Sequence, residues 1–244
     1  MEEQQQFVAT PEAKGKAKQL RLFAMLAWLL AIAGEIFAIV KLIHDETMVW
    51  LIVAIVVILL LAVLGSYLWK KANRLDPASE KNKVKFFIQS QLGAIMAVLA
   101  FLPLVIFIFT DKNASGKTKG IAGAIAIVAL LIGGISGIDF TPPSVEKYSE
   151  QINSQTAEIK DLTNGQDHIF WTPAGNKLHI YEDCQHIRNS DVSEGTVKDA
   201  WEARGIDNNE ICKTCIARAE KSKANAEDEI PSVEELQEAG SAIE

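Results

Sequence analysis

The sequence predicts an all-α membrane domain of four transmembrane helices, followed by a small α+β module. Two observations predict this fold class. Four long apolar runs occupy the first 140 residues, whereas the rest of the chain is polar. All three cysteines lie in that polar part, between residues 166 and 221. We therefore divide the chain into five parts: an N-terminal segment (1–19), a membrane domain (20–139), a helical linker (140–165), the cysteine-containing module (166–221) and an acidic tail (222–244).

The four apolar runs cover residues 20–43, 48–69, 86–109 and 120–138. Each is close to the ~20 residues that an α-helix needs to cross a hydrocarbon core of ~30 Å. The second run has twelve Leu, Ile or Val residues between Leu51 and Leu64 and no polar side chain. Four such runs leave no polar face to cover them in water, so we expect the lipid bilayer to surround them.

The first helix is predicted to begin before its apolar run. Thr10 can cap a helix, Pro11 suits the first helical position, and Glu12 is favourable beside the helix dipole. Ten Lys and Arg residues lie before the first run or between the second and third, against four in the other two loops. The positive-inside rule therefore places both termini in the cytoplasm. Thiols in that reducing compartment stay free to bind metal.

Some residues inside the spans call for a functional or a packing explanation. Glu35 is a carboxylate within the first span, which makes it a candidate for transport or proton carriage. Pro103 is expected to kink the third helix near Leu99. Gly133 and Gly137 are four residues apart, a spacing that allows close contact between helices in lipid.

An amphipathic helix is predicted in the linker over residues 144–162. Its apolar residues fall at heptad a and d spacing: Val145, Tyr148, Ile152, Ile159 and Leu162. Asn164-Gly165 should end the helix. Two interpretations remain open, because the apolar stripe can lie against the chain's own module or form a homodimer through the 144–162 helix.

The cysteines follow the spacing His179-x4-Cys184-x27-Cys212-x2-Cys215. A tetrahedral structural zinc site takes four nitrogen or sulfur ligands, and three cysteines with one histidine satisfy it. We therefore predict Zn²⁺ as the cofactor. His186 is the alternative to His179 as the fourth ligand. Buried inert cysteines and a redox Cys-x2-Cys pair are the alternatives to a metal site.

The local structure of the module is predicted from its turns and caps. Strands are expected over 169–172 and 177–181, with a short helix after Asp183 and a loop at Glu194-Gly195. A helix over 196–203 should carry a capping box of Thr196 and Asp199 and end at Gly205. A last helix should begin near Cys212. Trp171 and Trp201 are expected in the core of the module rather than on a binding face.

A resemblance covers about 50 residues of this module. It is carried by residues 169–175, followed by His179, Cys184, Ile187, Ala200, Gly205, Cys212 and Cys215. The stretch resembles small bacterial zinc-binding modules similar to the metal-binding domain of the Ada DNA-repair protein and to tails of some DNA-uptake channel proteins. The resemblance implies His179, Cys184, Cys212 and Cys215 as the metal ligands and a bacterial cell membrane as the location. Ile211 stands where that pattern has a proline.

These features favour a non-enzymatic protein, because a closed four-ligand site has no open coordination position. The leading hypothesis is a multi-pass membrane protein that presents a structural-zinc module to an unidentified protein partner. The alternatives are a metal-thiolate sensor of oxidation or alkylation, and a small transporter or channel that uses Glu35. A nucleic-acid partner is disfavoured because basic and acidic residues alternate along the module. The tail at 222–244 has seven acids against Lys223 and is expected to be disordered.

Overall fold

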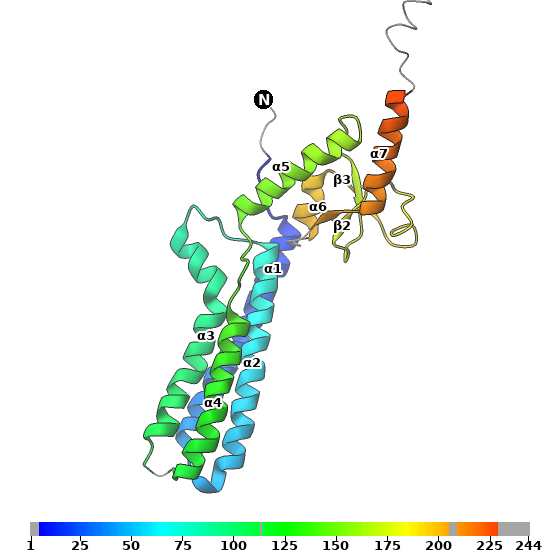
Figure 1. Ribbon diagram of the computed structural model, residues 1–244. Coiled ribbons are helices and arrows are strands. Elements are labelled where there is room, and N and C mark those ends of the chain that lie inside the picture. Colours follow the sequence, from blue (N-terminus) through cyan, green and yellow to red (C-terminus); the bar gives the residue numbers. More distant parts are fainter. Residues whose placement is uncertain (1–4, 113, 205–208, 229–244) are drawn as a thin grey trace, which may run out of the picture. The chain divides into compact units, whose positions relative to one another are not determined.

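Four long helices form the N-terminal part of the chain. The computed structural model describes residues 5–112, 114–204 and 209–228. In it α1 (Pro11–Lys41), α2 (Met48–Leu75), α3 (Lys83–Thr110) and α4 (Gly116–Gly137) run side by side (Figure 1). A short 3-10 helix, η1 (Asp45–Thr47), leads into α2. All four long helices have the length and the hydropathy to cross a membrane, which confirms the predicted fold class.

In α1, alanines face the inside of the bundle and most leucines face outward, whereas α2 and α3 also bury large side chains such as Ile55 and Phe101. Along α1 the buried positions include Ala24, Ala27 and Ala31, whereas Leu29 and Leu30 are 66% and 59% exposed. In lipid no hydrophobic effect drives apolar side chains into the bundle. Small residues instead favour helix association because they let the backbones approach closely. The outward leucines are therefore suited to hydrocarbon.

Glycines set the closest contacts in the bundle. A Cβ atom added at Gly137 of α4 would lie 2.4 Å from the backbone nitrogen of Ala94 in α3. At Gly65 of α2 it would lie 2.4 Å from Nε1 of Trp28, whose N–H donates to the carbonyl of Ala62. The close contact expected at Gly137 is thus present, and its neighbour is α3.

The start of α1 agrees with the sequence prediction. Thr10 is the N-cap, and its hydroxyl oxygen accepts a hydrogen bond from the backbone N–H of Ala13 at 3.1 Å. Pro11 occupies the first helical position, where its missing N–H removes no helical hydrogen bond.

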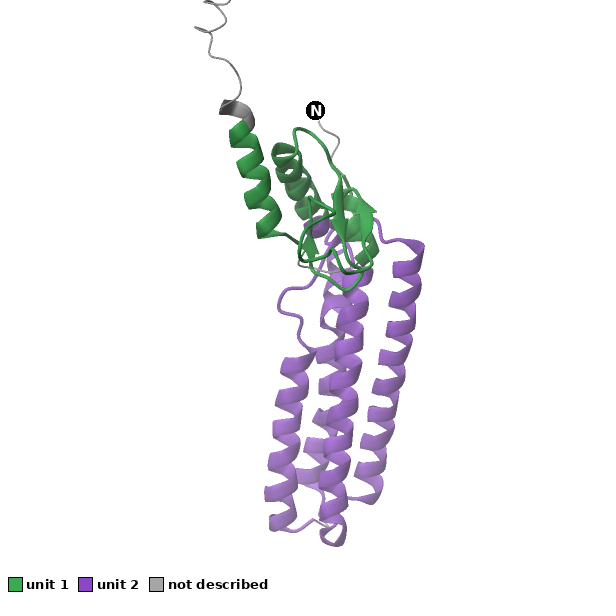
Figure 2. Cartoon of the chain, turned by 90° about the vertical axis from the view of Figure 1, so that its right-hand side faces the viewer, with its two compact units in different colours: residues 1–7, 149–244 green, residues 8–148 purple. Residues whose placement is uncertain are grey.

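The chain divides into two compact units (Figure 2). One unit, Val8–Tyr148, contains the four long helices, and the other combines Met1–Phe7 with Ser149–Glu244. Within the second of these, the side-chain amide of Asn153 pairs with both backbone groups of Gln5, at 2.9 and 3.1 Å. The N-terminal segment is therefore tied to the part of the chain that carries the cysteines.

Helix α5 (Val145–Leu162) lies where the heptad pattern placed it. Asn164 and Gly165 follow with φ angles of 54° and 94°, a left-handed turn that ends the helix. Ile152 and Ile159 are fully buried. The side chain of Gln155 accepts a hydrogen bond from Nε1 of Trp201 at 2.8 Å.

Gln155 also donates from its Nε2 to the carbonyl of Asn209. Helix α5 therefore packs against its own module, which is the first of the two arrangements that the sequence allowed. A homodimer through this helix would have to use positions outside the buried stripe.

The last helix, α7 (Lys213–Asp228), continues beyond the boundary expected for the module. Residues 222–228 are helical, whereas the sequence analysis assigned them to a disordered tail. The charge argument overlooked that Ala, Glu and Lys are strong helix formers. The rest of that tail, residues 229–244, lies outside the described residues.

Candidate metal centre

Two small sheets frame the cysteine-containing module. Strand β1 (Ile169–Trp171) pairs antiparallel with β3 (Ser193–Gly195), and β2 (Lys177–Leu178) pairs in parallel with β4 (Glu210–Ile211). Strands β1 and β2 lie where they were predicted, whereas Glu194-Gly195, predicted to be a loop, belongs to β3. Strand β3 is polar and β4 has only two residues, so neither has the apolar run by which β1 was predicted.

His179 lies directly after β2, which ends three residues earlier than predicted. Its backbone forms a bridge with Phe170, donating to that carbonyl at 2.8 Å and accepting from that N–H at 2.7 Å. Both backbone hydrogen bonds of the histidine are thus made with β1. The bridge holds the imidazole in place although the ladder with β4 has ended.

Cys184 lies in a series of tight turns rather than in the short helix expected after Asp183. Its carbonyl accepts hydrogen bonds from the backbone N–H groups of Ile187 and Arg188, at 2.9 and 3.1 Å. These bonds close single turns that do not continue into a helix, and they leave the cysteine side chain buried.

Cys212 and Cys215 lie at the junction of β4 and α7. The backbone N–H of Cys212 donates to the carbonyl of Leu178 at 2.8 Å, and its own carbonyl accepts from Ile216 at 3.0 Å. Cys215 belongs to the first turn of α7. Residues three apart at a helix start share one side, so the junction directs both thiols to the same place.

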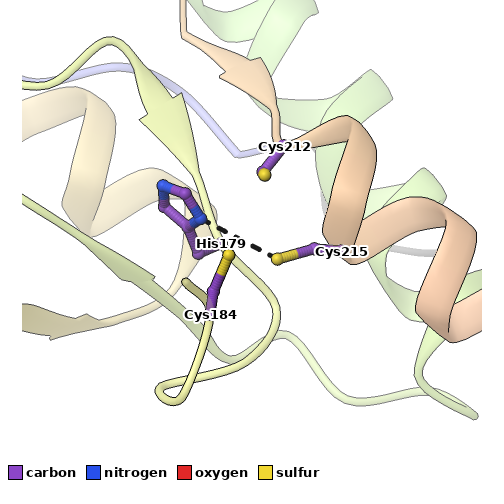
Figure 3. A group of neighbouring side chains, drawn as sticks. All are labelled: His179, Cys184, Cys212 and Cys215. Atoms are coloured by element: carbon purple, nitrogen blue, oxygen red, sulfur yellow. Dashed lines mark hydrogen bonds between the residues drawn. The ribbon is translucent and has the colours of Figure 1, made fainter. Parts of the chain in front are cut away.

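The structure brings His179, Cys184, Cys212 and Cys215 into one group. Their ligand atoms lie within 4.8 Å of one another, and all four side chains are buried. Sγ of Cys215 is 3.8 Å from Nδ1 of His179, and the second ring nitrogen points away from the sulfurs (Figure 3). A tetrahedral zinc ion with Zn–S bonds of ~2.3 Å separates its ligand atoms by roughly 3.6–3.8 Å. The group is therefore of the right size to hold a metal ion.

Electrostatics at the group also suit a cation. Burial, followed by the charges of His186 and Arg204, lowers the pKa of His179, which keeps the imidazole in the neutral form that binds metal. Burial raises the pKa of Cys215 to about 12. That thiol therefore needs a nearby cation to ionise at neutral pH, and a divalent metal would supply it.

Cys212 differs from Cys215 because it immediately precedes α7 instead of lying within its first turn. Burial raises the pKa of its thiol, but hydrogen bonds from the backbone N–H groups of Cys215 and Thr214 outweigh that effect. The net result is a pKa below the usual value for cysteine. The backbone N–H groups at the start of α7 thus favour the thiolate form of Cys212.

The other residues that the sequence left open lie elsewhere. His186 is exposed, and its Nε2 is 3.2 Å from the hydroxyl of Thr214. Trp171 and Trp201 are both buried, as expected for core residues. The three cysteines are buried and form no disulfide with one another.

A pocket borders the group on one side. Its volume is about 480 Å³. The lining residues that bear on the group are His179, Cys212, His186, Lys213 and Thr214. The ligand group is thus buried at the level of its side chains but adjoins a space large enough for a small molecule.

Comparisons with protein-family models, with curated proteins and with solved structures found no match for this chain. The function is therefore inferred from the geometry of the ligand group and from the membrane helices.

Proposed function

We propose that this chain is a multi-pass protein of a bacterial cell membrane that presents a zinc-stabilised cytoplasmic module to a protein partner. The single observation that carries the proposal is the buried group of three cysteines and one histidine. Four ligands of this type complete a tetrahedral zinc site and leave no position for a reacting water. Such a site favours a structural role over catalysis.

Zinc is the metal that this donor set favours. Tetrahedral sulfur and nitrogen ligation is typical of zinc, whereas oxygen ligands suit magnesium and calcium. The strands around the group are two or three residues long, so the sheets alone provide little cohesion. Structural zinc contributes apparent free energies of about 10–16 kcal/mol in finger peptides. We therefore expect the module to depend on its metal.

The orientation follows from the span number and the loop charges. An even number of spans is consistent with both termini on one side, and the lysine-rich loops support the cytoplasm as that side. The cysteines then face a reducing compartment, in which metal ligation and not disulfide formation is their expected chemistry.

The proposal is tested by metal analysis of the full-length protein purified in detergent. The wild type should carry one zinc per chain, with its three thiols protected from a thiol reagent until a chelator is added. His179→Gln and Cys212→Ser should lose the metal. His186→Gln is the matched control, because this exposed histidine lies two residues from Cys184 and outside the group. A wild-type protein without metal and with freely reactive thiols would overturn the proposal.

The partner role needs a separate experiment. A photo-crosslinking residue placed on the exposed face of α7, at Glu220, should capture the same protein from wild-type cells and from His186→Gln cells. Capture should fail in His179→Gln cells, because the module loses its fold without metal. Equal capture by all three proteins would show that the metal-stabilised module is not what the partner recognises.

A second candidate function, a thiolate sensor, is favoured by the pocket beside His179 and Cys212. Hydrogen peroxide could enter and transfer an oxygen atom to the thiolate of Cys212, giving a sulfenate and water, with release of the metal. Mild peroxide should then release zinc from the folded protein within minutes. Retention of zinc under conditions that oxidise free cysteine would leave the structural role as the better account.

A further inference from the structure

The proposed metal group carries a net charge that the protein has to balance. Three thiolates, one neutral imidazole and a divalent ion sum to −1, and the four side chains are at most 5% exposed. A buried charge is costly unless an opposite charge lies nearby. A site of this composition should therefore have a buried cation beside it. This inference rests on the proposed function and asks which residue supplies that cation.

Arg204, the last residue of α6 (Val197–Arg204), is a buried cation of this kind. It is only 7% exposed. Its Nε and Nη2 atoms are buried without a hydrogen-bond partner, and no carboxylate in the described parts of the chain forms an ion pair with it. Burial lowers the pKa of Arg204 to about 10, so the guanidinium is still charged at neutral pH.

The remaining guanidinium nitrogen places Arg204 next to the ligand-bearing strands. Nη1 donates to the carbonyls of Gly175 and Lys177, at 2.7 and 3.1 Å. Lys177 is two residues before His179 and begins β2. Strand β2 pairs with β4, which leads directly to Cys212. Arg204 therefore supports the strand pair that directly precedes two of the four ligands, His179 and Cys212.

Other cations near the group are already paired or exposed. Lys177 forms an ion pair with Glu210. Arg218 is exposed and pairs with Asp183 at 2.7 Å. Lys213 is exposed at the mouth of the pocket. Arg204 alone, among the cations that the structure describes in this module, is buried and lacks an acidic partner.

We infer that Arg204 is the counter-cation of the metal–thiolate group, and that its charge rather than its packing sustains metal affinity. This pairing accounts for two observations, the buried Arg204 without an acidic partner and the net negative charge of the proposed metal group. The metal–thiolate group is the negatively charged partner that Arg204 otherwise lacks. Arg204 is the positively charged partner that the group needs. Sequence reasoning treated this arginine as one of several basic residues scattered among acids, because nothing local marks it as buried.

The test compares three variants of the full-length protein in detergent, each competed for Zn²⁺ against a chromophoric chelator. Arg204→Gln removes the charge and keeps a hydrogen-bond donor. Arg204→Lys keeps the charge and shortens the donor. Arg218→Gln is the control, because it removes an exposed arginine of the same module. Residues that support metal ligands typically contribute about 10–100-fold to affinity. We expect Arg204→Gln to bind Zn²⁺ at least about tenfold more weakly, while Arg204→Lys and Arg218→Gln stay within about threefold of the wild type.

The possible outcomes separate the inference from the proposed function. A wild-type protein that binds no Zn²⁺ overturns both. Arg204→Gln with wild-type affinity overturns the counter-cation alone, and so does equal weakening by Gln and Lys, which would show that the two carbonyl hydrogen bonds matter instead. If Arg204→Gln unfolds the module, Co²⁺ titration of Arg204→Lys decides. A thiolate-to-cobalt absorption band and an affinity like those of the wild type support the inference, and a loss of either overturns it.

Discussion

Glu35 is the residue for which sequence and structure suggest different roles. The sequence placed a carboxylate inside a membrane span, which favoured transport. In the structure Glu35 is 3% exposed, and its Oε1 accepts a hydrogen bond from the backbone N–H of Leu104 at 3.2 Å. Leu104 directly follows Pro103, which lies inside α3. Because proline interrupts the hydrogen bonds of its own helix, the carboxylate serves a backbone donor at the interruption.

This role predicts an order among substitutions at Glu35. Glu35→Ala removes the carboxylate that accepts from the N–H of Leu104, which should lower the free energy of unfolding by about 1–3 kcal/mol. Glu35→Gln retains an amide oxygen at the same reach and should lower it much less. Thermal unfolding in detergent measures both, and Glu46→Ala, at an exposed position, is the control. If Gln were as harmful as Ala, the negative charge itself would matter, and the transporter hypothesis would gain support.

At the scale of the element, glycines in α4 have opposite environments one turn apart. A Cβ atom at Gly137 would meet backbone atoms of Gly93 and Ala94 at 2.4 Å, whereas one at Gly134 would meet nothing within 4 Å. Backbone atoms cannot move aside as a flexible side chain can. The two positions therefore separate helix packing from helix propensity.

Alanine substitutions should change stability in opposite directions at these two glycines. Gly134→Ala should stabilise α4 by up to about 1 kcal/mol, since alanine is the better helix former. Gly137→Ala should push α3 and α4 apart and lower the melting temperature. Thermal unfolding of the two variants in the same detergent makes the comparison. A Gly137→Ala protein as stable as Gly134→Ala would mean that α3 and α4 do not approach as closely as the structure shows.

Some helices and strands could be predicted from the sequence and others could not. Each membrane helix can be predicted from composition, because hydropathy over about twenty residues is a local property of the sequence. The start at Thr10 and the stop at Asn164-Gly165 are local too. Strand β4 is not, since two residues acquire their partner only when β2 is brought to them from more than thirty positions away. The alanine stripe of α1 was also missed, because a period of three to four is hidden where the residues from 22 to 34 are all apolar.

The four metal ligands could be predicted only in part from the sequence. Residue type and spacing were enough to choose Cys184, Cys212 and Cys215, but the choice between His179 and His186 depended on which ring faces the sulfurs. That is decided by the bridge between His179 and Phe170, a contact across the module. Arg204 was hidden for the same reason, since burial depends on the whole fold.

At the scale of the whole molecule, the two units have different sources of stability. The helices of the Val8–Tyr148 unit satisfy their backbone hydrogen bonds internally and need only lipid around them. The other unit has short strands, and its buried cysteines and histidine converge on one point. Loss of the metal should therefore affect only one of the two units.

Hydrogen exchange on the full-length protein in lipid nanodiscs tests this separation. A zinc chelator should strip protection from the backbone amides of β1, β2 and α6, because the proposed metal stabilises the module in which these elements lie. Amides in the middle of α1 to α4 should keep their protection, since no ligand lies on those helices. The Cys212→Ser variant should match the chelated wild type without any chelator. Persistent protection of α6 after complete metal removal would show that the core around Trp201 holds the module by itself, and that the metal has a role other than folding.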